Sequence, residues 1–317
     1  MTRPPPQVPA GLPPGSGVHG PGAHHPEALD TGWLRRSFER AAATLEDTGE
    51  LSAAVRETLL GRLDLARLVP RRVLDLGAGS GEGAVALKRR YPAAEVIAVD
   101  AAHGPLRRAL ARRRWLRPIR VLCADAQRLP LADGSIDLIV SHFMLPFCEV
   151  RELFGELCRV LAPRGYLGFS TLGPDTLKEL RAAWARVDEA PHVQRFLDMH
   201  DVGDALLAAG FAAPVLDVDH FSVRYESLAA LLRDLRASGA RNALRGRTRG
   251  LTTPRRIAAL AEAYEPFRIE GRLPASVEVI FGQAWGPEQR TRSGPQEAGV
   301  ARVPLTAIGH RARIGYP

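Results

Sequence analysis

Short runs of aliphatic and β-branched residues alternate with helical patterns between residues 70 and 172. A parallel sheet with crossover helices is encoded in this way. The alternation predicts strands at residues 73–76, 96–99, 119–122, 136–140 and 166–169, with helices near 82–90, 104–114 and 149–161. Two later strands, near 215–225 and 276–285, leave room for helices between them. We therefore expect an α/β fold, with a doubly wound, mostly parallel seven-stranded sheet and a helical insert between the last two strands.

A glycine-rich segment follows the first predicted strand and opens the next helix, as Asp75-Leu76-Gly77-Ala78-Gly79-Ser80-Gly81. Doubly wound sheets bind nucleotides at this place, and glycines let the backbone approach the ligand. Gly79-x-Gly81-x-x-Ala84 also satisfies a loose dinucleotide fingerprint. Asp75 favours S-adenosylmethionine instead, because a carboxylate there would repel a pyrophosphate but suits an ammonium group.

Two further acids follow the next two predicted strands. Asp100 ends VIAVD, where a carboxylate can accept hydrogen bonds from both hydroxyls of a ribose, although an NAD site would use it in the same way. Asp125, beside Ala126, follows the third strand, where an acceptor can meet the exocyclic amine of adenine. Together these positions predict S-adenosylmethionine as the cofactor, bound by Asp75, Gly77, Gly79, Gly81, Asp100, Asp125 and Ala126.

The cofactor motifs resemble those of the class I S-adenosylmethionine-dependent methyltransferases, whose sheet is Rossmann-like, over roughly residues 35–286. Later segments are similar to a narrower family, the malonyl-(acyl-carrier protein) O-methyltransferases of biotin synthesis: FSTLGPDTLKELR at 169–181, RFLDMHDVGD at 195–204, RDLRASGARN at 233–242, and the ending LPASVEV with GQAW. Two places depart from that family's pattern. Leu45 stands where the family has a tyrosine that closes over the active site, and Met144-Leu145-Pro146-Phe147-Cys148 replaces its Ala-Leu-Gln-Trp segment.

The resemblance implies O-methylation of the free carboxylate of a malonyl thioester carried on an acidic acyl-carrier protein, with the insert at 226–275 as a lid. The methyl ester would prime the pimeloyl stage of biotin synthesis. A carboxylate is already ionised at pH 7, so no general base is expected. Three alternatives stay open: a methyltransferase of another small-molecule or protein acceptor, a protein arginine hydroxylase like the complex I assembly factors, and a cofactor-binding scaffold without chemistry.

Positive charge is concentrated in two arginine runs, at residues 107–120 and 233–256, and 43 Lys+Arg against 35 Asp+Glu give a net charge of +8. We expect one arginine of the second run, Arg233 or Arg241, to bind the malonyl carboxylate, and the others to steer the acidic carrier. The basic runs lack regularly spaced aromatic residues and zinc-finger spacing, so no nucleic-acid partner is predicted.

For several polar residues, a functional interpretation stands beside a structural one. His142, at the end of the fourth predicted strand, can face the transferred methyl group as a catalytic residue or can be a packed, hydrogen-bonded residue. His192 and His200 are eight residues apart and lack ligand spacing, so no metal site is predicted. Thr176 to Glu179 has the pattern of a capping box, and Asp201 is the expected N-cap of a further helix.

The two ends of the chain lack apolar periodicity. Residues 1–30 are rich in Pro and Gly, and residues 287–317 are basic with weak apolar content, so we expect disordered tails around a methyltransferase domain at 31–286. No run of about 18 apolar residues and no targeting segment is found. The 3 cysteines fit neither zinc nor redox spacing. We expect a cytoplasmic monomer without membrane contact.

Overall fold

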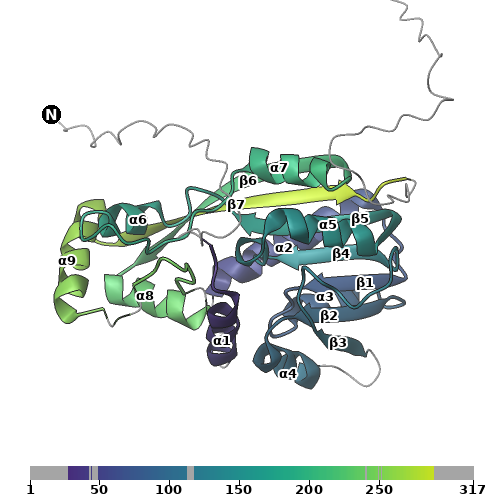
Figure 1. The fold of residues 1–317 in the computed structure, drawn as a ribbon, viewed down its shortest axis with the longest axis horizontal. Coiled ribbons are helices and arrows are strands. Elements are labelled where there is room, and N and C mark those ends of the chain that lie inside the picture. Colours follow the sequence, from purple (N-terminus) through teal and green to yellow (C-terminus); the bar gives the residue numbers. More distant parts are fainter. Residues whose placement is uncertain are drawn as a thin grey trace, which may run out of the picture.

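The computed structural model describes residues 28–42, 44, 49–112, 118–239, 241–248, 250 and 252–288. Its centre is a 7-stranded sheet in the order β3-β2-β1-β4-β5-β7-β6 (Figure 1). The strands are β1 (Arg72–Leu76), β2 (Glu95–Asp100), β3 (Ile119–Cys123), β4 (Ile136–His142), β5 (Leu161–Leu172), β6 (Ala212–Tyr225) and β7 (Leu273–Trp285). β1 to β5 run parallel, and β7 is antiparallel to both of its neighbours. The predicted fold class is confirmed.

Helices cover both faces of the sheet, as a doubly wound sheet requires. α5 (Val150–Val160) and α7 (Met199–Ala208) pack on one face. α2 (Gly49–Arg62) and α3 (Glu82–Arg90) pack on the other, and α4 (His103–Arg112) contacts β2 and β3. Successive side chains of β1 point to opposite faces of the sheet. Leu74 and Leu76 therefore pack in the apolar core on the side of α5, and Val73 packs in the core on the side of α3. Asp75 therefore shares the α3 face, next to the glycine loop.

The ribbon formed by β6 and β7 extends beyond the rest of the sheet. These two strands pair along their length, whereas β5 accompanies β7 only as far as Leu172, opposite Val279. The projecting part carries a separate apolar core with three helices, α6 (Lys178–Trp184), α8 (Leu228–Ala237) and α9 (Pro254–Tyr264). In Figure 1 this unit lies at the left, beyond the carboxyl ends of the parallel strands. The predicted helical insert between the last two strands, with α8 and α9, is confirmed.

Helix α1 (Thr31–Ala41) joins the insert to the sheet. Ser37 Oγ donates a hydrogen bond to the carbonyl of Gly239, just after α8, at 3.1 Å. On its other side, Glu39 accepts a hydrogen bond of 2.7 Å from the backbone N–H of Gly104, in the first turn of α4. α1 accordingly lies beside α8, between the insert and α4 (Figure 1).

Two local predictions about capping residues are wrong, although a helix begins within a few residues of each predicted place. The N-cap of α7 is Asp198, whose carboxylate accepts hydrogen bonds from the first turn, and not Asp201. Thr176 and Glu179 do not form a capping box, because both side chains bind β7. Thr176 Oγ1 donates to the carbonyl of Glu278 at 3.1 Å, and the Glu179 carboxylate accepts from the β7 backbone at 3.0 Å. A partner about 100 residues away in the chain has replaced the local one.

Nearly all of the two expected tails lies outside the described residues, so the domain boundaries stay a prediction. The described chain already packs at Leu29, which forms an isolated antiparallel bridge with Leu244. Among the residues that the structure describes, no helix is long and apolar enough to cross a membrane. The same residues contain no group of three or more His, Cys, Asp or Glu arranged to hold a metal ion.

Candidate active site

The carboxyl ends of β1, β2 and β3 are joined by backbone hydrogen bonds into one polar edge. The N–H groups of Gly77 and Ala78 donate to the carbonyl of Val99 at 2.8 and 2.9 Å. The N–H of Gly79 donates to Asp100 Oδ2 at 3.0 Å, and the N–H of Ala124 donates to the Asp100 carbonyl at 3.1 Å. The cofactor residues predicted from three separate strands are therefore neighbours.

The three glycines of the loop have different roles, although all have positive φ, of 73° at Gly77, 52° at Gly79 and 84° at Gly81. A Cβ on Gly81 would lie 2.6 Å from the Cβ of Ala109, and one on Gly77 would lie 2.6 Å from Cγ of Met144. A Cβ on Gly79 would meet nothing within 4 Å. Gly77 and Gly81 thus permit close packing, while Gly79 borders open space where a ligand fits.

Asp75 is buried beneath this loop with part of its hydrogen-bonding capacity unused. Its side chain lies under the first turn of α3, where the Ala84 N–H donates to it. Oδ2 is buried and has no hydrogen-bond partner. Burial raises the pKa of Asp75 to about 7, more than the Ala84 hydrogen bond lowers it. An ammonium group would supply the missing donor and favour the ionised carboxylate, so the site fits the methionine end of S-adenosylmethionine.

Asp100 and Asp125 extend this edge. Asp100 Oδ1 accepts a hydrogen bond from the Ala102 N–H at 2.8 Å while Oδ2 accepts from Gly79, and burial raises its pKa. Each carboxylate oxygen can accept a second hydrogen bond, so Asp100 retains capacity for a diol. Asp125 is exposed and accepts a hydrogen bond from the Gln127 N–H at 2.9 Å. Ala126, beside it, is half-buried.

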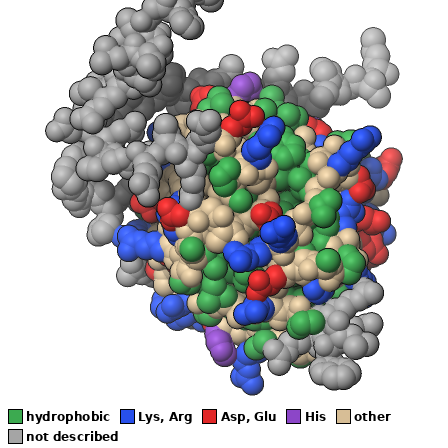
Figure 2. All heavy atoms as spheres, turned by 90° about the vertical axis from the view of Figure 1, so that its right-hand side faces the viewer, with side chains coloured by type: hydrophobic (Ala, Val, Ile, Leu, Met, Phe, Trp, Pro, Cys, Tyr) green, Lys and Arg blue, Asp and Glu red, His purple; other side chains and the backbone are tan. Residues whose placement is uncertain are grey.

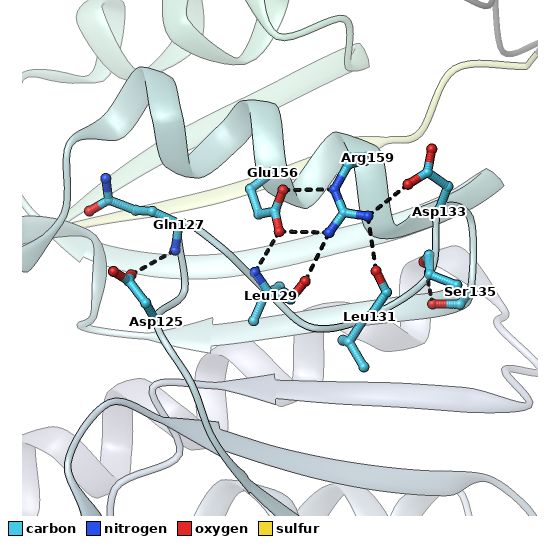
Figure 3. Close-up of polar contacts among 9 residues, drawn as sticks. Asp125, Gln127, Leu129, Leu131, Asp133, Ser135, Glu156 and Arg159 are labelled. Atoms are coloured by element: carbon cyan, nitrogen blue, oxygen red, sulfur yellow. Dashed lines mark hydrogen bonds and ion pairs between the residues drawn. The ribbon is translucent and has the colours of Figure 1, made fainter.

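A charged network behind Asp125 holds the loop between β3 and β4, and sequence reasoning missed it (Figure 3). Arg159 of α5 forms a two-point contact with Glu156, at 2.8 and 2.7 Å. The same guanidinium donates to the carbonyls of Leu129 and Leu131 and to Asp133. Arg159 lowers the pKa of Glu156, so the pair is ionised at pH 7. The signal in the sequence was the spacing of three residues between acid and base on one helix.

His142, at the carboxyl end of β4, is held at both ring nitrogens. Nε2 lies 3.0 Å from Ser52 Oγ, and Nδ1 lies 2.8 Å from Ser170 Oγ. Burial lowers the pKa of His142 to about 3, so the ring is neutral at pH 7. These contacts match the packed, hydrogen-bonded reading of this residue, and its contact with the methyl group stays a prediction.

The segment after β4 that departs from the family pattern contacts α1. The ring of Phe147 meets the ring of Phe38 edge to face, with centroids 5.1 Å apart. Gln194 Nε2 donates to the carbonyl of Pro146 at 2.9 Å. The residues that differ from the family pattern after β4 are thus part of the packing between α1 and the sheet. Leu45, which also differs from that pattern, lies outside the described residues.

Arg233 and Arg241 are both exposed, and within the described chain neither side chain has a hydrogen bond or ion pair. The structure does not bring them against the strand ends, so the arginine that binds the acceptor stays a prediction. Other members of this run have structural roles. Arg247 lies 3.1 Å from Asp30 and covers the ring of Trp33 at 4.8 Å.

The fold and the strand-end site define a class of protein. Residues 74–169 match the family described as a methyltransferase domain. The solved structure of the YcgJ protein from Bacillus subtilis superposes with a TM-score of 0.54, covering 74% of this chain and 99% of that chain at 20% identity, which shows a shared fold. The protein is an S-adenosylmethionine-dependent methyltransferase.

Curated relatives narrow this class. A protein of Methylovorus sp. (strain MP688) is 47% identical over 269 residues, which cover 83% of this chain and 91% of the relative. A protein of Halorhodospira halophila is 43% identical over 290 residues, which cover 90% of this chain and 98% of the relative. Both are named malonyl-[acyl-carrier protein] O-methyltransferase. The chain belongs to the malonyl-[acyl-carrier protein] O-methyltransferase family.

Proposed function

We propose that this protein methylates the free carboxylate of a malonyl group carried on an acyl-carrier protein. The observation that carries the proposal is the 47% identity, over 83% of the chain, to a relative named for this reaction. The polar edge at β1, β2 and β3 supports it. The product is a methyl ester that enters biotin synthesis.

The cofactor is held by the three strand ends. Asp75 would meet the ammonium group with its unpartnered oxygen, and Gly79 leaves space for the ligand above the loop. Asp100 would accept hydrogen bonds from the ribose hydroxyls, and Asp125 with Ala126 would border the adenine. Asp100 is oriented for this by the backbone N–H groups of Gly79 and Ala102.

When bound, S-adenosylmethionine supplies an electrophilic methyl group: a carboxylate oxygen bonds to the methyl carbon while the methyl–sulfur bond breaks and sulfur keeps the electron pair. No proton moves, so the chain needs no general base, and a neutral His142 fits this requirement. The task of the protein is to align the two reactants and exclude water. Such positioning supplies on the order of 7–11 kcal/mol of a bimolecular barrier.

Complementation tests the function in a cell. A bacterial strain that lacks its own malonyl-carrier methyltransferase needs biotin, and we expect the gene for this chain to restore growth without it. The Asp100→Ala variant is the matched negative control, provided that it accumulates as folded protein. Failure of the well-expressed parent chain to support growth would contradict the proposal.

The alternatives predict other acceptors. A methyltransferase of a different acceptor would leave malonyl-carrier protein unmodified, and an arginine hydroxylase would add oxygen to a protein side chain. The relatives described above carry the O-methyltransferase name, which favours the carboxylate. No observation on the site favours hydroxylation.

A further inference from the structure

Exposed arginines occur on two helices that meet in space but are about 190 residues apart in the sequence. We call them the α1–α8 basic surface: Arg35 and Arg40 on α1, Arg233 and Arg236 on α8, and Arg241 just after α8. All are exposed, and within the described residues none of their side chains has a hydrogen bond or ion pair. None of these five positive charges is therefore paired directly with a carboxylate of the described chain.

Three acidic residues lie near this surface, and each has a hydrogen-bond or ion-pair partner. Glu39 accepts hydrogen bonds from the α4 backbone, and Asp30 pairs with Arg247. Asp234 is the acid on the exposed side of α8, where it hydrogen-bonds to Tyr225. Of these carboxylates, Asp30 is paired with a cation, whereas Glu39 and Asp234 accept hydrogen bonds from neutral groups that cancel no charge. Five arginines therefore stand against two such carboxylates, and the surface keeps an excess of positive charge.

Charge is distributed differently at the far end of the molecule. Figure 2 views the side toward which β7 points, where the parallel strands begin, and its Lys and Arg side chains are interspersed with Asp and Glu. Interspersed charges of opposite sign cancel each other's field, whereas a cluster of one sign steers a charged partner, although salt screens that field over about 8 Å at physiological ionic strength.

The α1–α8 basic surface borders the candidate active site. Arg236 and Arg241 flank Gly239, where a Cβ would lie 2.7 Å from the ring of Phe38. Phe38 in turn contacts Phe147, which follows β4 at the carboxyl edge of the sheet. A partner bound to these arginines is therefore close to the segment that follows β4 at the carboxyl edge of the sheet.

We propose that the α1–α8 basic surface docks the acidic face of the carrier protein that delivers the acceptor. The inference rests on the proposed function, because it assigns a surface to the partner named there. The proposed docking surface includes α1 as well as the insert. Arg233 and Arg236 are neighbours on one face of α8, spaced by three residues, and α1 adds charge from the other side of the junction.

Charge reversal tests the docking surface. The variant Arg35→Glu/Arg40→Glu/Arg236→Glu alters the surface but leaves Arg233 and Arg241 in place. We expect its KM for malonyl-carrier protein at low salt to rise at least tenfold, its salt dependence to flatten, and its affinity for S-adenosylmethionine to stay within twofold of the parent. Fluorescence anisotropy should show the same loss of affinity for labelled carrier.

The matched control reverses three exposed arginines elsewhere, Arg71, Arg89 and Arg151, with the same change in net charge. It should keep the parental KM and carrier affinity. An equal loss in this control, or an unchanged KM in the surface variant, would overturn the docking site. Carrier methylation by the parent separates that result from failure of the proposed function. Binding of a short nucleic-acid duplex by the parent, with no binding of carrier, would overturn the assignment of the partner.

Discussion

At the scale of single residues, Asp75 gives the site a pH dependence. Its pKa is raised from 3.8 to about 7 in the folded chain, so the folded state holds this proton more tightly than the unfolded chain does. Its contribution to the free energy of unfolding therefore falls as the pH rises from about 4 to about 7. Because the ammonium group favours the carboxylate, we expect cofactor binding near pH 6.5 to release a proton from Asp75.

Calorimetry in buffers of different ionisation enthalpy measures this proton release. Asp75→Asn should abolish the part that comes from the carboxyl group and should weaken binding above pH 7. Any proton lost from the ligand's own amine remains in the variant, which serves as the correction. Equal release by the parent and Asp75→Asn would contradict the role of Asp75.

The carboxylate of Asp100 is the second residue to test. Asp100→Ala should weaken cofactor binding by about 1.5–3 kcal/mol, as loss of hydrogen bonds to a charged group does. Asp137→Ala is a matched control, because Asp137 also accepts two backbone hydrogen bonds, from Arg71 and Arg72, at the amino end of β1. If titration calorimetry gave the folded Asp100→Ala variant parental affinity, the ribose contact would be wrong.

At the scale of the element, the glycine loop separates packing from binding. Gly81→Ala should lower the free energy of unfolding by about 2–4 kcal/mol, since it combines overpacking against Ala109 with a left-handed backbone. Gly79→Ala meets no neighbour, so it should cost only about 1–2 kcal/mol in stability and mainly weaken the cofactor. Denaturant unfolding and cofactor titration compare the two variants. The reverse order of effects would contradict the assignment.

The loop between β3 and β4 depends on Arg159. Arg159→Ala should reduce the free energy of unfolding by about 1.5–3 kcal/mol and also weaken the cofactor, because the loop that carries Asp125 loses its anchor. Arg268→Ala removes a similar two-point contact, with Glu265, in the insert and should leave cofactor affinity unchanged. Parental cofactor affinity in folded Arg159→Ala would show that the loop needs no such anchor.

Regular elements were predictable where the sequence pattern is local. The strands and the helix at 82–90 follow from apolar periodicity and from the glycine loop. The place where α6 begins was predictable, but its capping was not, because Thr176 and Glu179 bind β7 and not their own helix. In the site, too, local features were predictable and long-range contacts were not. The strand-end acids can be located by counting along strands, whereas the meeting of Phe38 with Phe147 depends on how α1 packs across the fold.

At the scale of the whole molecule, the described chain has two units, each with its own apolar core. The parallel sheet supplies the strand ends, and the β6–β7 ribbon carries the insert beyond them, with α1 tied to both by Ser37 and Glu39. The sheet alone is common to methyltransferases of many acceptors, so it determines the cofactor more than the substrate. We therefore expect the choice of acceptor to depend on α1, the insert and the segment around Phe147.

The most direct measurement of the acceptor is mass spectrometry of carrier protein after incubation with the purified chain and S-adenosylmethionine. Malonyl-carrier should gain the mass of one methyl group in place of a proton, and mild ester hydrolysis should remove it. Acetyl-carrier, which has no free carboxylate, should stay unchanged. A malonyl-carrier that remains unmodified, while the chain binds S-adenosylmethionine and is folded, would contradict the account.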